Sequence, residues 1–200
     1  ESYETLTSAT YANMDALMFS DFAELALGVP KENIRMLIDE EANGLEMRRV
    51  FGQWLPALVQ GGQSDVYVFF AGHGLAARDG NSMFLLPTDA AADLLEFSAV
   101  RRQEVFDWLQ ASGARSVTVF LDTCFSGGTR GDETLVADRR GIGISARDAS
   151  LPESFTLITA ATGAQTSTSL PEAQQGLFSY FLMKGMEGDA DTNNDRQITA

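Results

Sequence analysis

Two apolar segments constrain the fold of this 200-residue chain more than any other feature. Residues 66–70 form a continuous run of β-favouring apolar side chains, and residues 117–122 form a second strand of this kind. Such strands are typical of parallel sheets that are covered on both faces. The sequence therefore predicts a buried, mostly parallel sheet.

Shorter strands and intervening helices complete this pattern. Further strands are predicted at residues 34–38, 83–87 and 155–160. Helices are predicted where apolar side chains recur at helical spacing, at residues 15–27, 101–112 and 177–185. A further helix, the second along the chain, is predicted after Asn43, which resembles an N-cap because Glu46 follows three residues later. Pro56 should kink the second helix or mark its final turn. This alternation predicts one α/β domain over residues 1–200, with helices on both faces of the sheet.

The charge and composition of the chain narrow the choice of partners. The formal net charge is −14, which disfavours nucleic acid and anionic membrane surfaces as partners and suits a cationic substrate or a metal cation. No run of 18 apolar residues is present, so no membrane span is expected. A single cysteine excludes an intrachain disulfide framework; its free thiol fits a reducing compartment such as the cytoplasm but does not establish one.

The only cysteine and the only histidine occupy equivalent places in the pattern. His73 follows the first apolar run and Cys124 follows the second, 51 residues later (124 − 73), and each has glycine close behind it. Parallel strands end at one rim of a sheet, where ligands bind in α/β folds. A thiol becomes a strong nucleophile when a neighbouring imidazole takes its proton. The pair therefore indicates a cysteine hydrolase; the alternative is a small buried thiol and a structural histidine.

Asp122 adds a prediction about specificity. It lies two positions before Cys124 on the same predicted strand, so the two side chains should point the same way. A carboxylate there would pair with arginine or lysine before the scissile bond and repel aspartate. The alternative is a strand-end carboxylate held by backbone N–H groups.

Five segments resemble, in order, the motifs of caspase-like cysteine peptidases (clan CD, family C14), in their bacterial metacaspase-like or orthocaspase branch. They are residues 11–16 (Tyr-Ala-Asn-Met-Asp-Ala), 69–74 (Phe-Phe-Ala-Gly-His-Gly), 122–127 (Asp-Thr-Cys-Phe-Ser-Gly), 176–182 (Gly-Leu-Phe-Ser-Tyr-Phe-Leu) and 188–191 (Gly-Asp-Ala-Asp). A histidine about 50 residues before the nucleophile is also the caspase spacing. The resemblance implies a three-layer sandwich with a central, mostly parallel sheet flanked by helices.

The resemblance also implies roles for individual residues. Cys124 would attack the scissile carbonyl to form a thioester, and His73 would protonate the leaving amine. The backbone N–H groups of Gly74 and Cys124 would form the oxyanion hole. Asp122 and Asp15 would line a pocket for arginine or lysine, so that protein or peptide substrates carry basic residues. For Asp15, the alternative is a helix-terminal acid beside the helix dipole.

Two rival functions remain open from the sequence. One is a caspase-fold peptidase of another specificity, for example one that cleaves after acidic or small residues. The sequence departs from the metacaspase pattern at Ala71, where metacaspases often carry serine, so one pocket hydrogen bond is lost. The other is a non-catalytic signalling or scaffold module, against which the intact Cys124–His73 pair argues. No feature of the sequence indicates an oligomeric state.

A long glycine-rich, charged segment follows the nucleophile. Residues 127–152 show no clear periodicity, and residues 128–152 stand where relatives carry a processing linker. Candidate self-cleavage sites there are Arg130, Arg139, Arg140 and Arg147. The alternative is an ordinary loop, although loops of this length in a compact domain are usually functional or disordered.

Residues 189–200 contain part of an EF-hand-like loop. Asp191, Asn193 and Asp195 would be the oxygen ligands at positions 1, 3 and 5, but Arg196 stands where the loop needs glycine. Calcium is therefore a possible cofactor, whereas the expected chemistry itself requires none. The resemblance further implies a first strand before Tyr3, outside this sequence.

Overall fold

The computed structural model describes residues 2–77, 82–123, 125, 151–160 and 169–195. Its centre is a sheet of three parallel strands in the order β1-β5-β6. These strands are β1 (Asp65–Ala71), β5 (Ser116–Asp122) and β6 (Phe155–Thr159). Ala71 lies opposite Asp122, so β1 and β5 end side by side at one rim.

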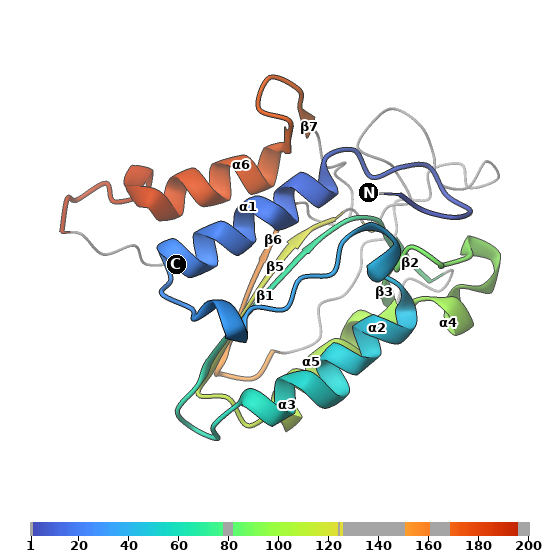
Figure 1. Cartoon of the computed structure of the whole chain (residues 1–200), viewed down its shortest axis with the longest axis horizontal. Coiled ribbons are helices and arrows are strands. Elements are labelled where there is room, and N and C mark those ends of the chain that lie inside the picture. Colours follow the sequence, from blue (N-terminus) through green and yellow to red (C-terminus); the bar gives the residue numbers. More distant parts are fainter. Residues whose placement is uncertain (1, 78–81, 124, 126–150, 161–168, 196–200) are drawn as a thin grey trace.

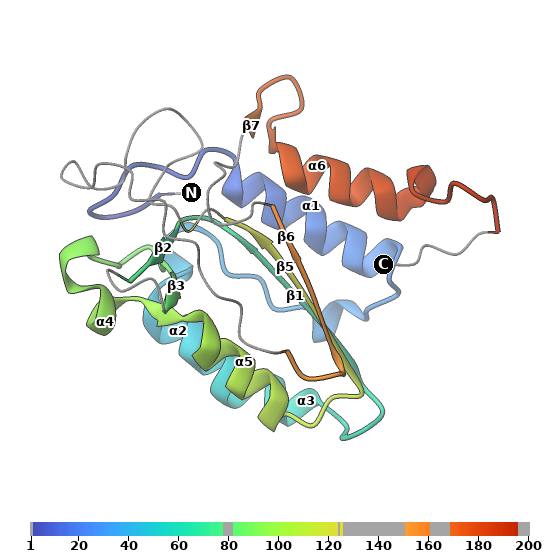
Figure 2. The ribbon, with the colours of Figure 1, turned by 180° about the vertical axis from the view of Figure 1, so that it is seen from behind.

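Helices cover both faces of this sheet (Figure 1), as the view from behind also shows (Figure 2). One face carries α1 (Ala12–Leu25) and α6 (Leu177–Lys184). The other carries α2 (Gly44–Arg49), a π-helical turn η3 (Val50–Trp54), α3 (Leu55–Leu58) and α5 (Arg102–Ala111). The expected three-layer α/β fold is therefore confirmed.

The side chains of β5 join the two helical layers because they alternate between the faces of the sheet. Val117, Val119 and Leu121 belong to the core that includes Val105 and Leu109 of α5. On the opposite face, Phe120 packs with Phe19 and Phe22 of α1 and Met183 of α6. Both faces of β5 are thus buried, as its apolar sequence predicts.

Smaller elements surround the rim where β1 and β5 end. An antiparallel sheet contains β2 (Gly74–Ala76), β3 (Met83–Leu85) and β4 (Val100–Arg101). A separate hairpin pairs β7 (Ser169–Leu170) with β8 (Gln175–Gly176), which leads into α6. The remaining elements are α4 (Leu95–Ser98), three 3-10 turns η1 (Lys31–Asn33), η2 (Asp39–Glu41) and η4 (Ala92–Leu94), and a π-helical turn η5 (Gly185–Asp189).

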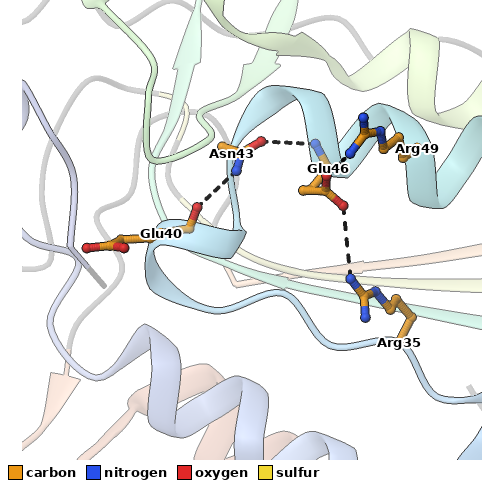
Figure 3. A network of polar contacts seen from close by, with 5 residues as sticks. All are labelled: Arg35, Glu40, Asn43, Glu46 and Arg49. Atoms are coloured by element: carbon orange, nitrogen blue, oxygen red, sulfur yellow. Dashed lines mark hydrogen bonds and ion pairs between the residues drawn. The ribbon is translucent and has the colours of Figure 1, made fainter.

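The start of α2 follows the predicted capping pattern in part. The Asn43 side-chain oxygen accepts a hydrogen bond from the Glu46 backbone N–H at 3.0 Å, as an N-cap does. The Glu46 carboxylate instead pairs with Arg49 and Arg35 (Figure 3). Pro56 lies in α3, two residues before that helix ends, so it marks the final turn.

The strand predicted at residues 34–38 is wrong. Ile34 and Ile38 have extended backbone, but the segment pairs with no described strand. It lines a cavity of about 520 Å³ together with the outer edge of β1, so no ladder can form between the two. The sequence of this segment sets its extended conformation, whereas strand pairing requires a neighbour within hydrogen-bond distance.

The same cavity corrects the prediction that β1 is fully buried. Among the described strands, β1 pairs only with β5 and is an edge strand. Tyr67, in its middle, is 38% exposed.

Among the described residues, no helix is both long enough and apolar enough to cross a membrane.

Candidate active site

His73 and Thr123 lie at the same rim of the sheet because each follows a strand of the same parallel pair. His73 comes two residues after β1, and Thr123 directly follows β5. The Gly72 backbone N–H donates to the Asp122 carbonyl at 3.3 Å and extends the pairing past the end of β1. Cys124 lies outside the described residues, between Thr123 and Phe125, so its pairing with His73 stays a prediction.

The imidazole of His73 is buried, with 3% of the residue exposed. Its Nε2 lies 2.8 Å from the backbone carbonyl oxygen of Thr7. A carbonyl oxygen can only accept, so Nε2 carries the hydrogen in this contact. The neutral ring then keeps Nδ1 as the nitrogen that can accept a proton.

Gly74 fits tightly against Thr123 and Phe125, which follow β5 in the sequence. A Cβ atom at this position would lie 2.6 Å from Thr123 Oγ1 and 2.9 Å from two ring atoms of Phe125. The Ala76 backbone N–H also donates to the Phe125 carbonyl at 3.1 Å. The backbone of β2 therefore packs directly on Thr123 and Phe125, and a side chain at its first position would require one of these two residues to move.

Asp15 and Asp122 are fully buried, and both bond to the beginning of α6. The backbone N–H of Gly176 lies 2.9 and 3.2 Å from the two carboxylate oxygens of Asp15. The hydroxyl of Ser179 donates to Asp122 Oδ2 at 2.6 Å. The structure thus brings residues from α1, the end of β5 and the start of α6 into one buried polar cluster.

Sequence reasoning did not assign roles to four contributors to this region. Ser179 and the Gly176 N–H hold the two aspartates, and Tyr3 and the Thr7 carbonyl contact His73. The only local signal was the Gly-Leu-Phe-Ser segment that opens the last helix. A backbone carbonyl such as that of Thr7 leaves no trace in the sequence.

Two groups of predicted residues are not placed at this site. The four arginines of residues 128–152 lie outside the described residues. Asp191, Asn193 and Asp195 are described and bond among themselves: the Asp195 N–H lies 3.1 Å from Asp191 Oδ1, and Asn193 Nδ2 donates to Asp195 Oδ2 at 2.9 Å. No cluster of three or more His, Cys, Asp or Glu suited to a metal occurs in the described part of the chain.

The comparison with protein families identifies the chain. The family model of the caspase domain matches residues 3–199, which is nearly the whole sequence. The chain therefore belongs to the caspase domain family and is, in general terms, a caspase-like cysteine peptidase. A search of curated proteins finds no match.

Proposed function

We propose that this protein is a metacaspase-like cysteine endopeptidase that cleaves after arginine or lysine through Cys124 and His73. The observation that carries the specificity is the buried carboxylate of Asp122, two residues before the nucleophile and at the rim where the chemistry would occur. Asp15, which is equally buried, reaches the same end of α6.

In the proposed reaction, His73 Nδ1 takes the proton of the Cys124 thiol. The thiolate attacks the carbonyl carbon before the scissile bond, and the N–H groups of Gly74 and Cys124 donate to the oxyanion. His73 returns its proton to the leaving amine as the C–N bond breaks, which leaves a thioester on Cys124. Water then attacks the thioester, gives a proton to His73 and releases the carboxylic acid and the thiol.

The Asp15–Asp122 cluster suits a cationic side chain. Burying carboxylates is costly unless hydrogen bonds and opposite charge compensate. The Gly176 N–H donates to Asp15, and the Ser179 hydroxyl donates to Asp122. A guanidinium offers five N–H donors and a full positive charge, and a lysine ammonium offers three donors. An aspartate side chain would instead add a third negative charge.

The first test is hydrolysis of fluorogenic peptides that end in Arg, Lys or Asp, with and without calcium. We expect cleavage after Arg or Lys by the wild type and none by Cys124→Ala. Cleavage after Asp would overturn the proposed pocket while retaining the nucleophile. Absence of cleavage with every peptide, together with failure of an active-site alkylating probe to label Cys124, would favour the scaffold function. Equal rates without calcium would dismiss a calcium requirement.

We further propose that the enzyme cuts itself after one of Arg130, Arg139, Arg140 and Arg147. These residues follow the nucleophile in a segment rich in glycine and charge, and they match the proposed specificity. Intact mass spectrometry of purified protein should give two fragments for the wild type and one full-length mass for Cys124→Ala. Identical full-length masses in both samples would remove this proposal.

A further inference from the structure

Residues 2–7 form an N-terminal strap that crosses the molecule beside His73. Backbone and side-chain bonds tie the strap to the segment after β3. The Glu4 N–H donates to the Thr88 carbonyl at 3.0 Å, and Thr5 Oγ1 donates to the Ala90 carbonyl at 2.8 Å. At the start of the strap, the Ser2 N–H donates to Asp39 Oδ1 at 3.2 Å.

Tyr3 is the strap residue that contacts His73 with its side chain. The Tyr3 hydroxyl oxygen accepts a hydrogen bond from the His73 backbone N–H at 2.9 Å. The two rings lie 4.7 Å apart between centroids and are tilted by 40°. Four residues further along the strap, the Thr7 carbonyl contacts His73 Nε2. The strap therefore contacts both the backbone and the ring of His73.

The Tyr3 hydroxyl also links His73 to the end of β3. It donates to the Leu86 carbonyl at 3.2 Å, and the Leu86 N–H donates to the His73 carbonyl at 3.0 Å. These bonds connect Tyr3, His73 and Leu86 in a closed circuit. The absence of a side chain at Gly72 leaves room for the Tyr3 hydroxyl, because a Cβ atom there would lie only 2.7 Å from the hydroxyl oxygen.

We propose that Tyr3 is a positioning residue for His73: its hydroxyl holds the strap so that the Thr7 carbonyl keeps the hydrogen on Nε2 and leaves Nδ1 to exchange protons with Cys124. This inference rests on the proposed function for the role of Nδ1. The orientation of the imidazole, however, can be measured without any substrate. Phenylalanine at position 3 would keep the ring contact and remove both hydroxyl bonds.

The test uses the fact that His73 is the only histidine. Nitrogen-15 NMR of imidazole-labelled protein therefore reports His73 alone, and the two ring nitrogens have distinct shifts in each tautomer. At a pH where the ring is neutral, the wild type should show the Nε2–H tautomer. Tyr3→Phe should move both shifts toward a tautomer mixture. With an Arg peptide, kcat should fall roughly tenfold, which corresponds to the upper range of the net free energy of one hydrogen bond. KM should stay unchanged.

Thr5→Val is the matched control. It removes a hydroxyl hydrogen bond from the same strap. The Thr5 hydroxyl, however, donates to the Ala90 carbonyl, whereas the Tyr3 hydroxyl bonds to His73. The control should lower the melting temperature without changing the nitrogen shifts or kcat. If Thr5→Val changes the shifts as much as Tyr3→Phe, the hydroxyl has only a general structural role and the inference fails.

The two proposals fail in different ways. Unchanged nitrogen shifts and unchanged kcat in Tyr3→Phe would overturn the positioning role while Cys124-dependent cleavage stands. A wild-type ring that carries its hydrogen on Nδ1 would overturn it as well. A tautomer change in Tyr3→Phe, in a protein that cleaves no peptide, would keep the positioning role and remove the proposed peptidase specificity.

Discussion

Gly74 and Thr123 show how closely the segment after β1 packs against the residue that follows β5. Because a Cβ atom at position 74 would lie 2.6 Å from Thr123 Oγ1, any residue other than glycine must displace Thr123, which directly precedes Cys124 in the sequence. The same displacement would move the Gly74 N–H away from the expected position of the oxyanion. Substitutions here should therefore affect catalysis more than folding.

For Gly74→Ala we expect kcat to fall by about 100-fold, which is typical for the loss of one oxyanion-hole donor. The added Cβ would also contact the ring of Phe125 at 2.9 Å. Gly52→Ala is the matched control, because nothing lies within 4 Å of the corresponding Cβ and its φ is not positive. Peptide hydrolysis and circular dichroism of both variants check the prediction. Equal activity in the two variants would contradict it.

For Asp122→Asn we expect kcat/KM for Arg peptides to fall by about 100-fold, as when one partner of a buried charge pair is removed. Asparagine keeps the shape and the bond from Ser179 but removes the negative charge. Ser179→Ala should cause a smaller loss, since it removes one hydrogen bond to a charged group. Asp21→Asn, at an exposed position of α1, is the control and should retain full activity. An unchanged preference for Arg in Asp122→Asn would place the cation elsewhere.

The beginnings of β1 and β5 are joined by an ion pair on the protein surface. Arg115 Nε donates to Asp65 Oδ1 at 2.9 Å, and the Ser116 hydroxyl donates to the same oxygen at 2.6 Å. These bonds, that from Arg115 foremost, hold the pKa of Asp65 below its ordinary value of 3.8. The ionised carboxylate is thus favoured in the folded protein.

This pKa shift predicts a specific pH dependence of stability. The contribution of Asp65 is present above its unfolded pKa, near 3.8, and is lost as the pH falls through the lower folded value. The free energy of unfolding of the wild type should exceed that of Asp65→Asn by a constant, modest amount above about pH 5, and the difference should shrink below about pH 4. Urea unfolding at several pH values measures this, with Asp21→Asn as the control. A difference that grows toward low pH would contradict the assigned cause.

The exposed outer edge of β1 leads to a second prediction at the scale of secondary-structure elements. In a parallel ladder, successive residues bond alternately to the two sides. Because the Gly72 N–H bonds to β5, the N–H groups of Val66, Val68 and Phe70 should also face β5, while those of Tyr67 and Phe69 face the cavity. Hydrogen exchange followed by NMR should show slow Val66, Val68 and Phe70 amides and faster Tyr67 and Phe69 amides. Uniform protection along β1 would mean that this edge is covered in solution.

At the scale of the whole molecule, the sequence predicts the layers better than the contacts between distant segments. Helical spacing and apolar runs predict α1, α5, α6, β1, β5 and β6, because those patterns reflect burial within one element. Residues 34–38 show the limit: the sequence favours an extended chain, but pairing depends on what lies beside it. The position of His73 just after β1 could also be predicted, since apolar strands of a parallel sheet end at its rim.

The contacts that complete the site could not be predicted in this way. Tyr3 reaches His73 across 70 residues, and Gly176 reaches Asp15 across 161. Contacts at such separations leave no periodicity, and several use backbone atoms that every residue type possesses. Only the folded chain shows that Gly176 of β8 and Ser179 of α6 donate to the two aspartates. The family match supports the overall peptidase assignment but does not specify these contacts.

The residues of the buried aspartate cluster are far apart in the sequence, so the cluster can form only late in protein synthesis. Its parts come from residue 15, residue 122 and residues 176–179, which leave the ribosome far apart in time. A nascent chain that has already exposed His73 and Cys124 still lacks Gly176 and Ser179, which donate to the two carboxylates. On the proposed function, the peptidase cannot acquire its specificity before α6 has emerged from the ribosome and packed against α1 and β5.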